Sequence, residues 1–447
     1  MTIIIVVFFT LQDINDLIKE SILIKDGNPA RYRLIKKTDN LDQSKPYRKM
    51  TFGERDTSKL HKTILIVGET GTGKTTLINA MINYMLDVQR EDKVWFEITD
   101  DQSDRSQVHS QTSSITVYGF YLQESPIHLT IIDTPVYGDT RGVEKDKEIA
   151  ESLLRLSESA EGVHEVHAVC LVINATQTKL SDRQIYIFDA VQSLFGRDTA
   201  ENIVLLFTHS DGARPKDALT AVKEAKVKCA VNDKNQPVFF LFDNCQSEAA
   251  DEDHEQRLDQ SWNRSFRGMA GLFKFIDSIK PKSLKMTQDV LQKRKQLEAN
   301  ISNLQSRVQM IELKKNELKQ TQEALKQNKK DVEENNDFEY EVEVPYKEKR
   351  TYEELKKKYN DKISDGVSVV KKLEEELQEL EKAKLKLVMD AFHCVDSLEM
   401  IALNTVSLFT LQHIDDLIEK LKEINESEKA KTLEEIKKKA GREKKEL

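Results

Sequence analysis

The sequence is poor in the residues that usually interrupt regular structure. It holds 15 glycines and 8 prolines in 447 residues, and long uninterrupted helices are expected because these residues normally mark the ends of short elements. Cysteine is also scarce, and the four thiols form no C-x-x-C pair and have no histidine partner at zinc spacing: Cys170, Cys229, Cys245 and Cys394. That spacing argues against a zinc site and predicts buried thiols in a reducing, cytoplasmic environment.

Length and charge narrow the class further. A chain of 447 residues is too long for one ordinary domain, so two or three units are expected. The net charge of -9 argues against a general nucleic-acid binder. The apolar start, Met1 to Thr10, is too short to span a bilayer and lacks the basic region of a secretion signal. It predicts a strand, a buried helix turn or a ragged chain start, and this segment gives no support for membrane association.

The segment GETGTGKT is a complete phosphate-binding loop, placed between an apolar run at 63–67 and a helix-type segment that opens at Thr75. Glycines let backbone N–H groups surround phosphate oxygens, Lys74 reaches the β- and γ-phosphates, and the Thr75 hydroxyl ligates Mg²⁺. The helix N-terminus adds partial positive charge. Lys74 is therefore also a candidate catalytic residue, and the candidate nucleotide contacts are Gly68, Glu69, Thr70, Gly71, Thr72, Gly73, Lys74, Thr75 and Thr76.

From residue 63 to residue 279, apolar runs alternate with amphipathic segments, and the runs begin near residues 115, 129, 168, 202 and 237. This alternation predicts an α/β fold with a mainly parallel sheet covered on both faces. Ser181 and Gln184 form a capping box that predicts a helix running to about Phe195. We therefore expect an N-terminal extension at 1–59 and a nucleotide-binding domain, the G domain, at 60–280.

Beyond Pro281 the apolar residues recur every seven positions, from Val290 through Leu297 and Leu304 to Val332. A second run with spacings of three and four follows from about Tyr352. Together they predict an α-helical coiled-coil region, an antiparallel hairpin at 281–390. Residues 391–447 are expected to form a further helical region. Its lysine- and glutamate-rich tail predicts a solvated face, with membrane-surface binding as the alternative.

Two smaller features lie outside this pattern. Residues 338–346 alternate apolar and acidic side chains, which predicts a strand-like tip that either reverses the chain or offers an acidic, aromatic contact surface. Residues 9–18 nearly repeat residues 409–418, with eight of ten positions identical. Duplication and convergent amphipathic patterning both explain the repeat.

The remaining motifs bear on which nucleotide is bound. Asp133 ends an apolar run, where its carboxylate can hold Mg²⁺ through a water molecule. Asp211, in the segment Thr208-His209-Ser210-Asp211, lies where a carboxylate would accept hydrogen bonds from guanine N1–H and its exocyclic amine, which adenine cannot donate. Thr208, His209 and Asn244 are candidate contacts beside it. A switch threonine that reaches the γ-phosphate and Mg²⁺ is expected before the run at 115; we assign it to Thr112, with Thr116 as the alternative.

In this order the motifs resemble those of septin-like phosphate-loop GTPases, and most closely the immunity-associated (GIMAP-type, AIG-type) family, over residues 60–280. The residues that carry the resemblance are GETGTGKT, DTPVYGD, the segment from Val166, THSD and FDN. This resemblance implies binding of GTP, GDP and Mg²⁺, slow hydrolysis, and nucleotide-dependent assembly with further copies or related G domains.

Two departures from the family pattern concern hydrolysis. Val136 stands where the family has a glycine, and Tyr137 where a water-orienting glutamine is usual. The sequence therefore predicts a slow GTPase that assembles through its G domain and uses a coiled-coil arm. The alternative is a coiled-coil scaffold whose nucleotide is structural and never cycles. An ATP-dependent motor or kinase is a third, weaker hypothesis, since no kinase lid or acceptor-base motif is present.

Overall fold

The structure is a computed structural model, and it describes residues 14–38, 47–99, 115–123, 125, 127–134, 143–158, 163–248, 255–334, 336–344, 346–358, 366–405 and 408–445. Within these ranges the chain forms two compact units. The first, which we call the G unit, comprises residues 1–291, 401–408 and 439–447. The second, the helical unit, comprises residues 292–400 and 409–438.

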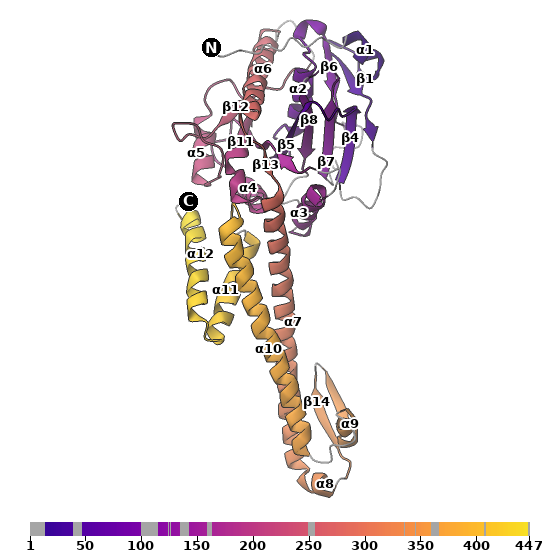
Figure 1. Ribbon diagram of the computed structural model, residues 1–447, viewed down its shortest axis with the longest axis vertical. Helices are drawn as coiled ribbons and strands as arrows, with labels where there is room; N and C mark the ends of the chain where they lie inside the picture. The colour runs from indigo at the N-terminus through magenta and orange to yellow at the C-terminus, as the bar shows by residue number, and fades with distance from the viewer. Residues whose placement is uncertain are drawn as a thin grey trace. The chain divides into compact units, whose positions relative to one another are not determined.

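An eight-stranded sheet forms the centre of the G unit (Figure 1), with strand order β12-β11-β10-β5-β8-β7-β4-β3. Neighbouring strands are parallel except for the pairs β7/β8 and β3/β4. The predicted mainly parallel sheet is confirmed. Its strands are β3 Lys37–Thr38, β4 Tyr47–Gly53, β5 Leu60–Gly68, β7 Ile115–Tyr121, β8 Ile127–Asp133, β10 Ala168–Asn174, β11 Ile203–Thr208 and β12 Phe239–Leu241.

Alternate residues of each strand feed two separate cores, because successive side chains point to opposite faces of a sheet. On β5, Ile64 and Ile66 belong to one core, and Leu65 and Val67 belong to the other. Helices α2 (Lys74–Met85) and α6 (Glu255–Ser278) cover the first face, while α4 (Asp182–Leu194) and α5 (Lys216–Glu224) cover the second. The parallel sheet is thus covered on both faces, as its continuous apolar strands require.

The start of α4 follows the predicted capping box. The Ser181 hydroxyl accepts a hydrogen bond from Gln184 N at 3.1 Å, and Gln184 Oε1 accepts one from Ser181 N at 2.9 Å. Two backbone N–H groups that the helix leaves unpaired are thereby satisfied. This prediction is confirmed, and the cap fixes the first turn of α4.

Strands β3 and β4 come from the part of the chain before residue 60, the predicted boundary of the G domain. In β4 only Met50 and Phe52 are buried, and Thr51 separates them. This short alternation is a weak signal for a strand near a sheet edge, which explains why the sequence did not point to it. The rest of this region forms a small sheet, β1-β2-β6, beside helix α1. Its elements are α1 Ile14–Lys19, β1 Ser21–Lys25, β2 Ala30–Leu34 and β6 Val94–Glu97.

The remaining elements of the G unit are short or connect the larger ones. Strand β9 pairs with β13 in a two-stranded sheet. The near-repeat falls on α1 and α11, where Leu17 and Leu417 are both buried; residues 9–13 lie outside the described residues. The bounds of these further elements are η1 Arg90–Asp92, α3 Val143–Glu158, β9 Glu165–Val166, η2 Arg197–Asn202 and β13 Lys282–Ser283.

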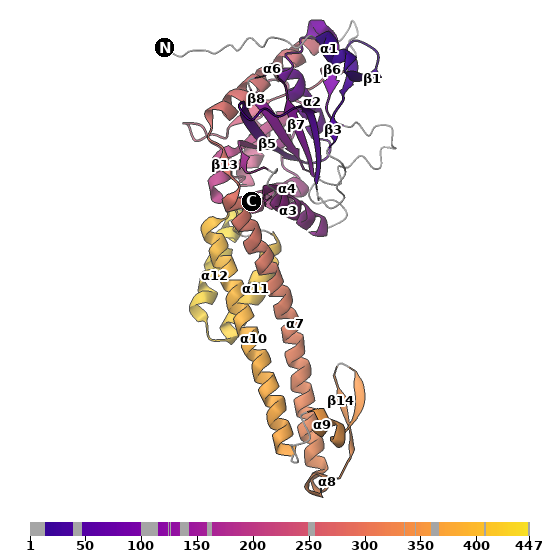
Figure 2. The ribbon, with the colours of Figure 1, turned by 45° about the vertical axis from the view of Figure 1, so that its right-hand side comes forward.

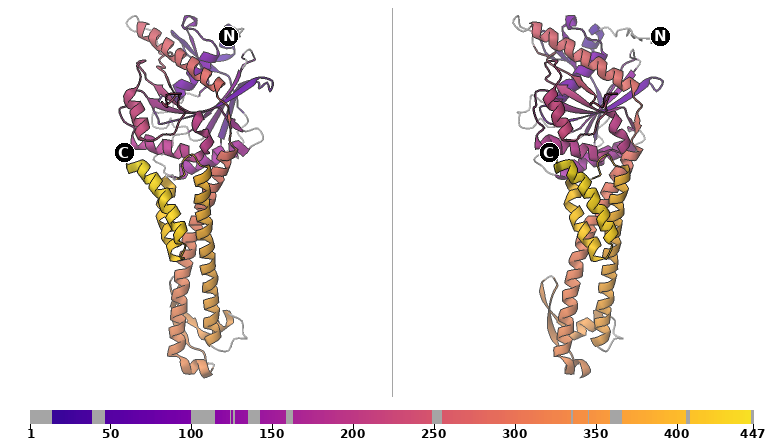
Figure 3. Two further views of the ribbon diagram at one scale, coloured as in Figure 1. Left: turned by 60° about the vertical axis from the view of Figure 1, so that its left-hand side comes forward. Right: turned by 90° about the vertical axis from the view of Figure 1, so that its left-hand side faces the viewer.

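Two long helices, α7 (Lys285–Gln327) and α10 (Gly366–Ile401), dominate the helical unit and lie side by side within it (Figures 2 and 3). Asn300 Nδ2 donates to Cys394 Sγ at 3.8 Å, and Lys314 pairs with Glu376 at 2.5 Å. The later residue of α7 contacts the earlier residue of α10, so the two helices are antiparallel. The heptad residues Leu297, Ile301, Leu304 and Ile311 are buried. A large helical region after the G domain is confirmed, while the coiled-coil geometry stays a prediction.

The stretch at 338–346 that alternates in polarity contains a strand, which pairs with the next strand in an antiparallel hairpin. Tyr340 and Val342 are buried, and the alternating glutamates Glu339, Glu341 and Glu343 are exposed. Proline 345 lies outside the described residues. The other elements of this unit are α8 Lys329–Glu334, β14 Glu339–Glu343, β15 Lys347–Thr351, α9 Tyr352–Lys358, α11 Leu408–Glu423 and α12 Ser427–Lys445.

A buried carboxylate fastens the hairpin to α7. Glu317 has 3% exposure and accepts hydrogen bonds from Lys314 at 2.9 Å, Arg350 at 2.7 Å and Lys358 at 3.2 Å. Burial alone would raise the pKa of Glu317, but the bonds from Lys314 and Arg350 outweigh it and lower the pKa to about 2.

Replacing this carboxylate should loosen the tip of the helical unit. Glu317→Gln leaves three cations without their common partner, and breaking a buried ion pair in this way costs roughly 3 kcal/mol. We expect faster hydrogen exchange in β14 and β15, while Glu312→Gln, an exposed change on the same helix, should have no effect. Because the folded pKa lies below the ordinary value of 4.5, the stabilisation is present above pH 4.5 and is lost as pH falls toward 2. Unchanged exchange rates in Glu317→Gln would contradict this account.

Candidate nucleotide-binding site

The loop between β5 and α2 has the backbone of a phosphate cradle. Gly71 and Gly73 have φ angles of +80° and +82°, which side-chain-bearing residues rarely adopt. Gly73 is also the N-cap of α2 and brings no side chain to the helix end. No N-cap side chain therefore occupies the first N–H groups of α2. The N-terminal end of a helix favours negative charge, so these groups are placed to meet an anion.

Lys74 lies across this loop. Its Nζ donates to the carbonyl oxygens of Gly68 at 2.7 Å and Glu69 at 3.1 Å. Burial lowers the pKa of Lys74, and the negative charges of Asp133 and Glu69 oppose that shift. This half-buried ammonium, which neutral carbonyl oxygens hold among the described residues, would gain much from an anion placed beside it.

Asp133 ends β8 beside Ile66 of β5 and is buried, with 4% exposure. Its Oδ1 atom is buried and has no hydrogen-bond partner among the residues that the structure describes. Burial raises the pKa of Asp133 to about 6, although the Lys74 charge opposes the shift. A divalent cation fits this position, because Mg²⁺ binds carboxylate oxygens directly or through water. Its positive charge would offset the buried negative charge of the carboxylate.

The predicted threonines differ in what the structure says of them. Thr75 lies on the first turn of α2 and is exposed, so its hydroxyl is accessible at the helix end. Thr116 is buried on β7 and pairs with Asp133 on the neighbouring strand β8. Thr112, Val136 and Tyr137 lie outside the described residues. The assignment of the switch threonine therefore remains a prediction.

The segment Thr208-His209-Ser210-Asp211 follows β11 and contacts the phosphate loop. The Thr208 hydroxyl donates to the Thr72 carbonyl oxygen at 2.7 Å. His209 takes a left-handed backbone, with φ +53°, and its Cε1 atom would lie 3.6 Å from a Cβ placed on Gly73. Asp211 is exposed, and its Oδ1 accepts a hydrogen bond from Ala213 N at 2.8 Å. This turn orients a carboxylate that is free to take further donors.

Asn244 lies in the loop after β12, and a backbone hydrogen bond joins this loop to the segment 208–211. Ser210 N donates to the Phe242 carbonyl oxygen at 3.0 Å, which ties the two loops together. Asn244 Oδ1 accepts a hydrogen bond from the Ser265 hydroxyl at 2.9 Å. Its Nδ2 atom is buried and has no partner in the structure. An acceptor on a bound base would satisfy this donor.

Sequence reasoning did not point to two arginines near the site. Arg183, on the first turn of α4, approaches Glu69 of the phosphate loop, with Nε 3.8 Å from Oε1. The capping box at Ser181 was the signal that could have located it. Arg264, on α6, contacts the loops that hold Ser210 and Asp243, and no sequence motif marks it.

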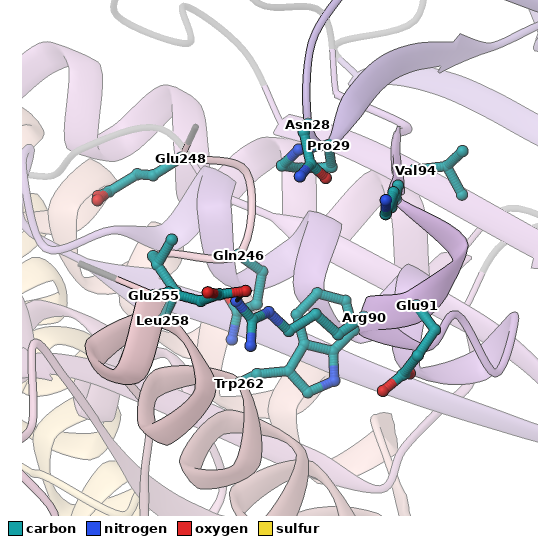
Figure 4. A pocket seen from close by; sticks show the side chains of 11 residues that line it. Asn28, Pro29, Arg90, Glu91, Val94, Gln246, Glu248, Glu255, Leu258 and Trp262 are labelled. Carbon is teal, nitrogen blue, oxygen red and sulfur yellow. Dashed lines mark hydrogen bonds and ion pairs between the residues drawn. The ribbon is translucent and has the colours of Figure 1, made fainter. Parts of the chain in front are cut away.

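A separate cavity of about 230 Å³ lies beside Gln246 (Figure 4). Arg90 reaches over Trp262 there, with its guanidinium beside Glu255 at 3.5 Å, and it also pairs with Asp259. The phosphate loop does not line this cavity, and the charge of Arg90 is already matched by carboxylates. The cavity is therefore separate from the phosphate loop. Its lining residues are Asn28, Pro29, Arg90, Glu91, Lys93, Val94, Gln246, Glu248, Glu255, Leu258 and Trp262.

None of the helices in the described ranges has the length and apolar character that crossing a bilayer requires. A search of the curated proteins finds no match. Among solved structures the chain is similar to Toc33 from Arabidopsis thaliana in complex with GDP and Mg²⁺, at 12% identity and TM-score 0.33, covering 49% of this chain and 86% of that one. It is also similar to Toc33 in complex with Mg²⁺ and GMPPNP, at 14% identity and TM-score 0.33, covering 50% and 88%.

A bacterial selenocysteine-specific elongation factor, EF-Sec, shows a likeness at 13% identity and TM-score 0.29, covering 49% of this chain and 29% of that one. The model of the AIG1 family matches residues 62–261. That range contains the phosphate loop, Asp133 and Asp211, and it lies inside the region where the motifs resemble AIG-type GTPases. Residues 62–261, which are less than half of the chain, are therefore similar to the AIG1 family.

Proposed function

We propose that the chain binds GTP and GDP with Mg²⁺, hydrolyses GTP slowly, and self-assembles through its G domain, while the antiparallel pair α7 and α10 serves oligomerisation or partner binding. One observation carries the nucleotide part. The half-buried Lys74 and the buried Asp133 lie at the same edge of the sheet, beside a glycine loop shaped for phosphate. Among the described residues, Asp133 Oδ1 has no hydrogen-bond partner. A metal-bound triphosphate would place phosphate oxygens beside the Lys74 ammonium and Mg²⁺ beside the Asp133 carboxylate.

Each residue has a definite role in this proposal. Backbone N–H groups of residues 68–76 and Lys74 hold the phosphates, and Thr75 with Asp133 holds Mg²⁺, with the switch threonine at Thr112 or Thr116. A bound Mg²⁺ would neutralise charge on the phosphate oxygens. Asp211 accepts donors from the guanine edge, with Thr208, His209 and Asn244 beside it. The AIG1-family match supports the guanine assignment through the family's implied binding of GTP.

A scaffold with a structural nucleotide is the second candidate, and the replacement of glycine by Val136 favours it. A valine N–H can still meet the γ-phosphate, but its backbone is less free to move between two states. Single-turnover measurement of phosphate release, at low and high protein concentration, separates the two functions. Release that rises with concentration supports the assembling GTPase, whereas bound GTP that stays intact favours the scaffold.

Nucleotide selectivity tests the site directly. Titration of fluorescent GTP and ATP into the purified protein should show tighter binding of GTP by at least tenfold, since adenine leaves the Asp211 carboxylate without donors. Lys74→Ala should abolish binding of both nucleotides, while Lys223→Ala, an exposed change on α5, should leave binding intact. Asp211→Asn should favour xanthine over guanine nucleotide, because its amide donates where the carboxylate accepted. Equal affinity for GTP and ATP in the wild type rules out the guanine assignment.

Replacing Asp133 should raise the stability of the protein and weaken its binding of Mg²⁺ and GTP. Its folded pKa of about 6 lies above the ordinary 3.8, so its contribution to stability is full below pH 4 and is lost as pH rises through about 6. Without Mg²⁺ and nucleotide, Asp133→Asn should therefore stabilise the protein at pH 7.5 by roughly 1–2 kcal/mol. With Mg²⁺ and GTP it should bind at least tenfold more weakly. Thermal unfolding with and without Mg²⁺ and GTP measures both effects, and the exposed Asp233→Asn serves as control.

Assembly is tested by the mass of the protein in solution. Sizing by light scattering in GDP and in a non-hydrolysable GTP analogue should give a larger species with the analogue, since the two nucleotides differ at the γ-phosphate. Lys74→Ala should give the same mass under both conditions. Identical profiles for the wild-type protein would favour the scaffold.

A further inference from the structure

One face of α6 contacts both loops that surround the proposed base site. Ser261, Arg264 and Ser265 lie on this face, at the three- and four-residue spacings that place helical side chains together. The Ser261 hydroxyl donates to the Asp243 carbonyl oxygen. Ser265 Oγ accepts from Asp243 N at 2.9 Å and donates to Asn244 Oδ1 at 2.9 Å. The loop after β12 is therefore held to α6 through backbone and side chain.

Arg264 extends this contact to the other loop and holds the backbone on both sides of Asp211. Its Nη1 donates to the Ser210 carbonyl oxygen at 2.7 Å. On the other side, Gly212 has φ +92° and packs so closely that a Cβ there would lie 2.9 Å from Arg264 Nε. The residue between these two contacts is Asp211, whose own Oδ1 is oriented by Ala213 N.

The same guanidinium also reaches the second loop. Arg264 Nη1 lies 2.8 Å from Asp243 Oδ2, in an ion pair whose side chains are 21% and 17% exposed. Charge-assisted hydrogen bonds of this kind are stronger than neutral ones. A planar guanidinium offers several donors in fixed directions, whereas a lysine ammonium offers a point charge on a flexible stem. Together with the backbone hydrogen bond from Ser210 N to the Phe242 carbonyl oxygen, Arg264 therefore sets the spacing between the loop of Asp211 and the loop of Asn244.

We propose that Arg264 is a positioning residue that sets guanine specificity, because it holds Asp211 and Asn244 at the separation that a guanine edge requires. This inference rests on the proposed function. Arg264 itself touches no base: it acts through Ser210, Gly212 and Asp243. The phosphate loop does not depend on it, so its loss should affect recognition of the base more than binding of the phosphates.

The affinities for GTP, ITP and ATP test this role. ITP keeps the N1–H of guanine but lacks the exocyclic amine, so the ratio of GTP to ITP affinity reports on the placement of Asp211. Arg264→Gln should lower GTP affinity about tenfold and ITP affinity less than threefold, which reduces the ratio. Arg264→Lys can donate to the Ser210 carbonyl oxygen but cannot span both loops rigidly, and it should lower the ratio at least threefold. Arg267→Gln, an exposed change one turn along α6, is the matched control.

The outcomes separate the two levels of the proposal. A wild-type protein that does not prefer GTP over ATP contradicts the proposed function. If the wild type prefers GTP but folded Arg264→Gln and Arg264→Lys keep its ratio of GTP to ITP affinity, Arg264 has no role in specificity. Equal losses for all three nucleotides would assign it a merely structural role and also overturn the proposal. Thermal unfolding of each variant establishes that it is folded, and Asp243→Asn gives a second way to weaken the same link, with a smaller loss of the ratio expected.

Discussion

The opposite charges of Lys74 and Asp133, which lie at the carboxyl edge of the sheet, are the constraint around which the G unit is arranged. Among the described residues, the half-buried ammonium is held by carbonyl oxygens, and the buried carboxylate leaves Oδ1 unpaired. Burial moves the pKa of Lys74 down and that of Asp133 up, so each charge is held at a cost. Charged groups with pKa values shifted by burial are enriched at functional sites.

The parallel sheet explains how residues far apart in sequence reach this edge. Strands β5, β8 and β11 are parallel members of one sheet, so their carboxyl ends, and the loops that follow them, meet on the same side. The phosphate loop follows β5, Asp133 ends β8, and Asp211 follows β11. The hydrogen bond from Thr208 to the Thr72 carbonyl oxygen joins the first and last of these loops. One bound molecule could therefore contact all three.

The sequence predicted the phosphate loop, the strands and the start of α4 because the interactions that form them are local. The glycine loop, the apolar strands and the capping box at Ser181 each depend on residues within about ten positions of one another, and the structure has each of them. Strand β4 was not predicted because its pairing with β7 is a long-range interaction that two alternating apolar residues signal only weakly. Arg264 was not predicted for the same reason: its partners Ser210 and Asp243 are 54 and 21 residues away, and an arginine on an amphipathic helix carries no mark of its role.

Buried carboxylates in the two units differ in a way that separates binding from structure. Glu317 in the helical unit has three cationic partners from its own chain, and its pKa falls to about 2. Asp133 in the G unit has a free oxygen, and its pKa rises to about 6. Burial raises the pKa of both carboxyls: the charge-assisted hydrogen bonds at Glu317 outweigh that effect, whereas the Lys74 charge near Asp133 does not. Glu317 therefore fastens two segments together, while under the proposed function a bound cation would supply the further positive charge at Asp133.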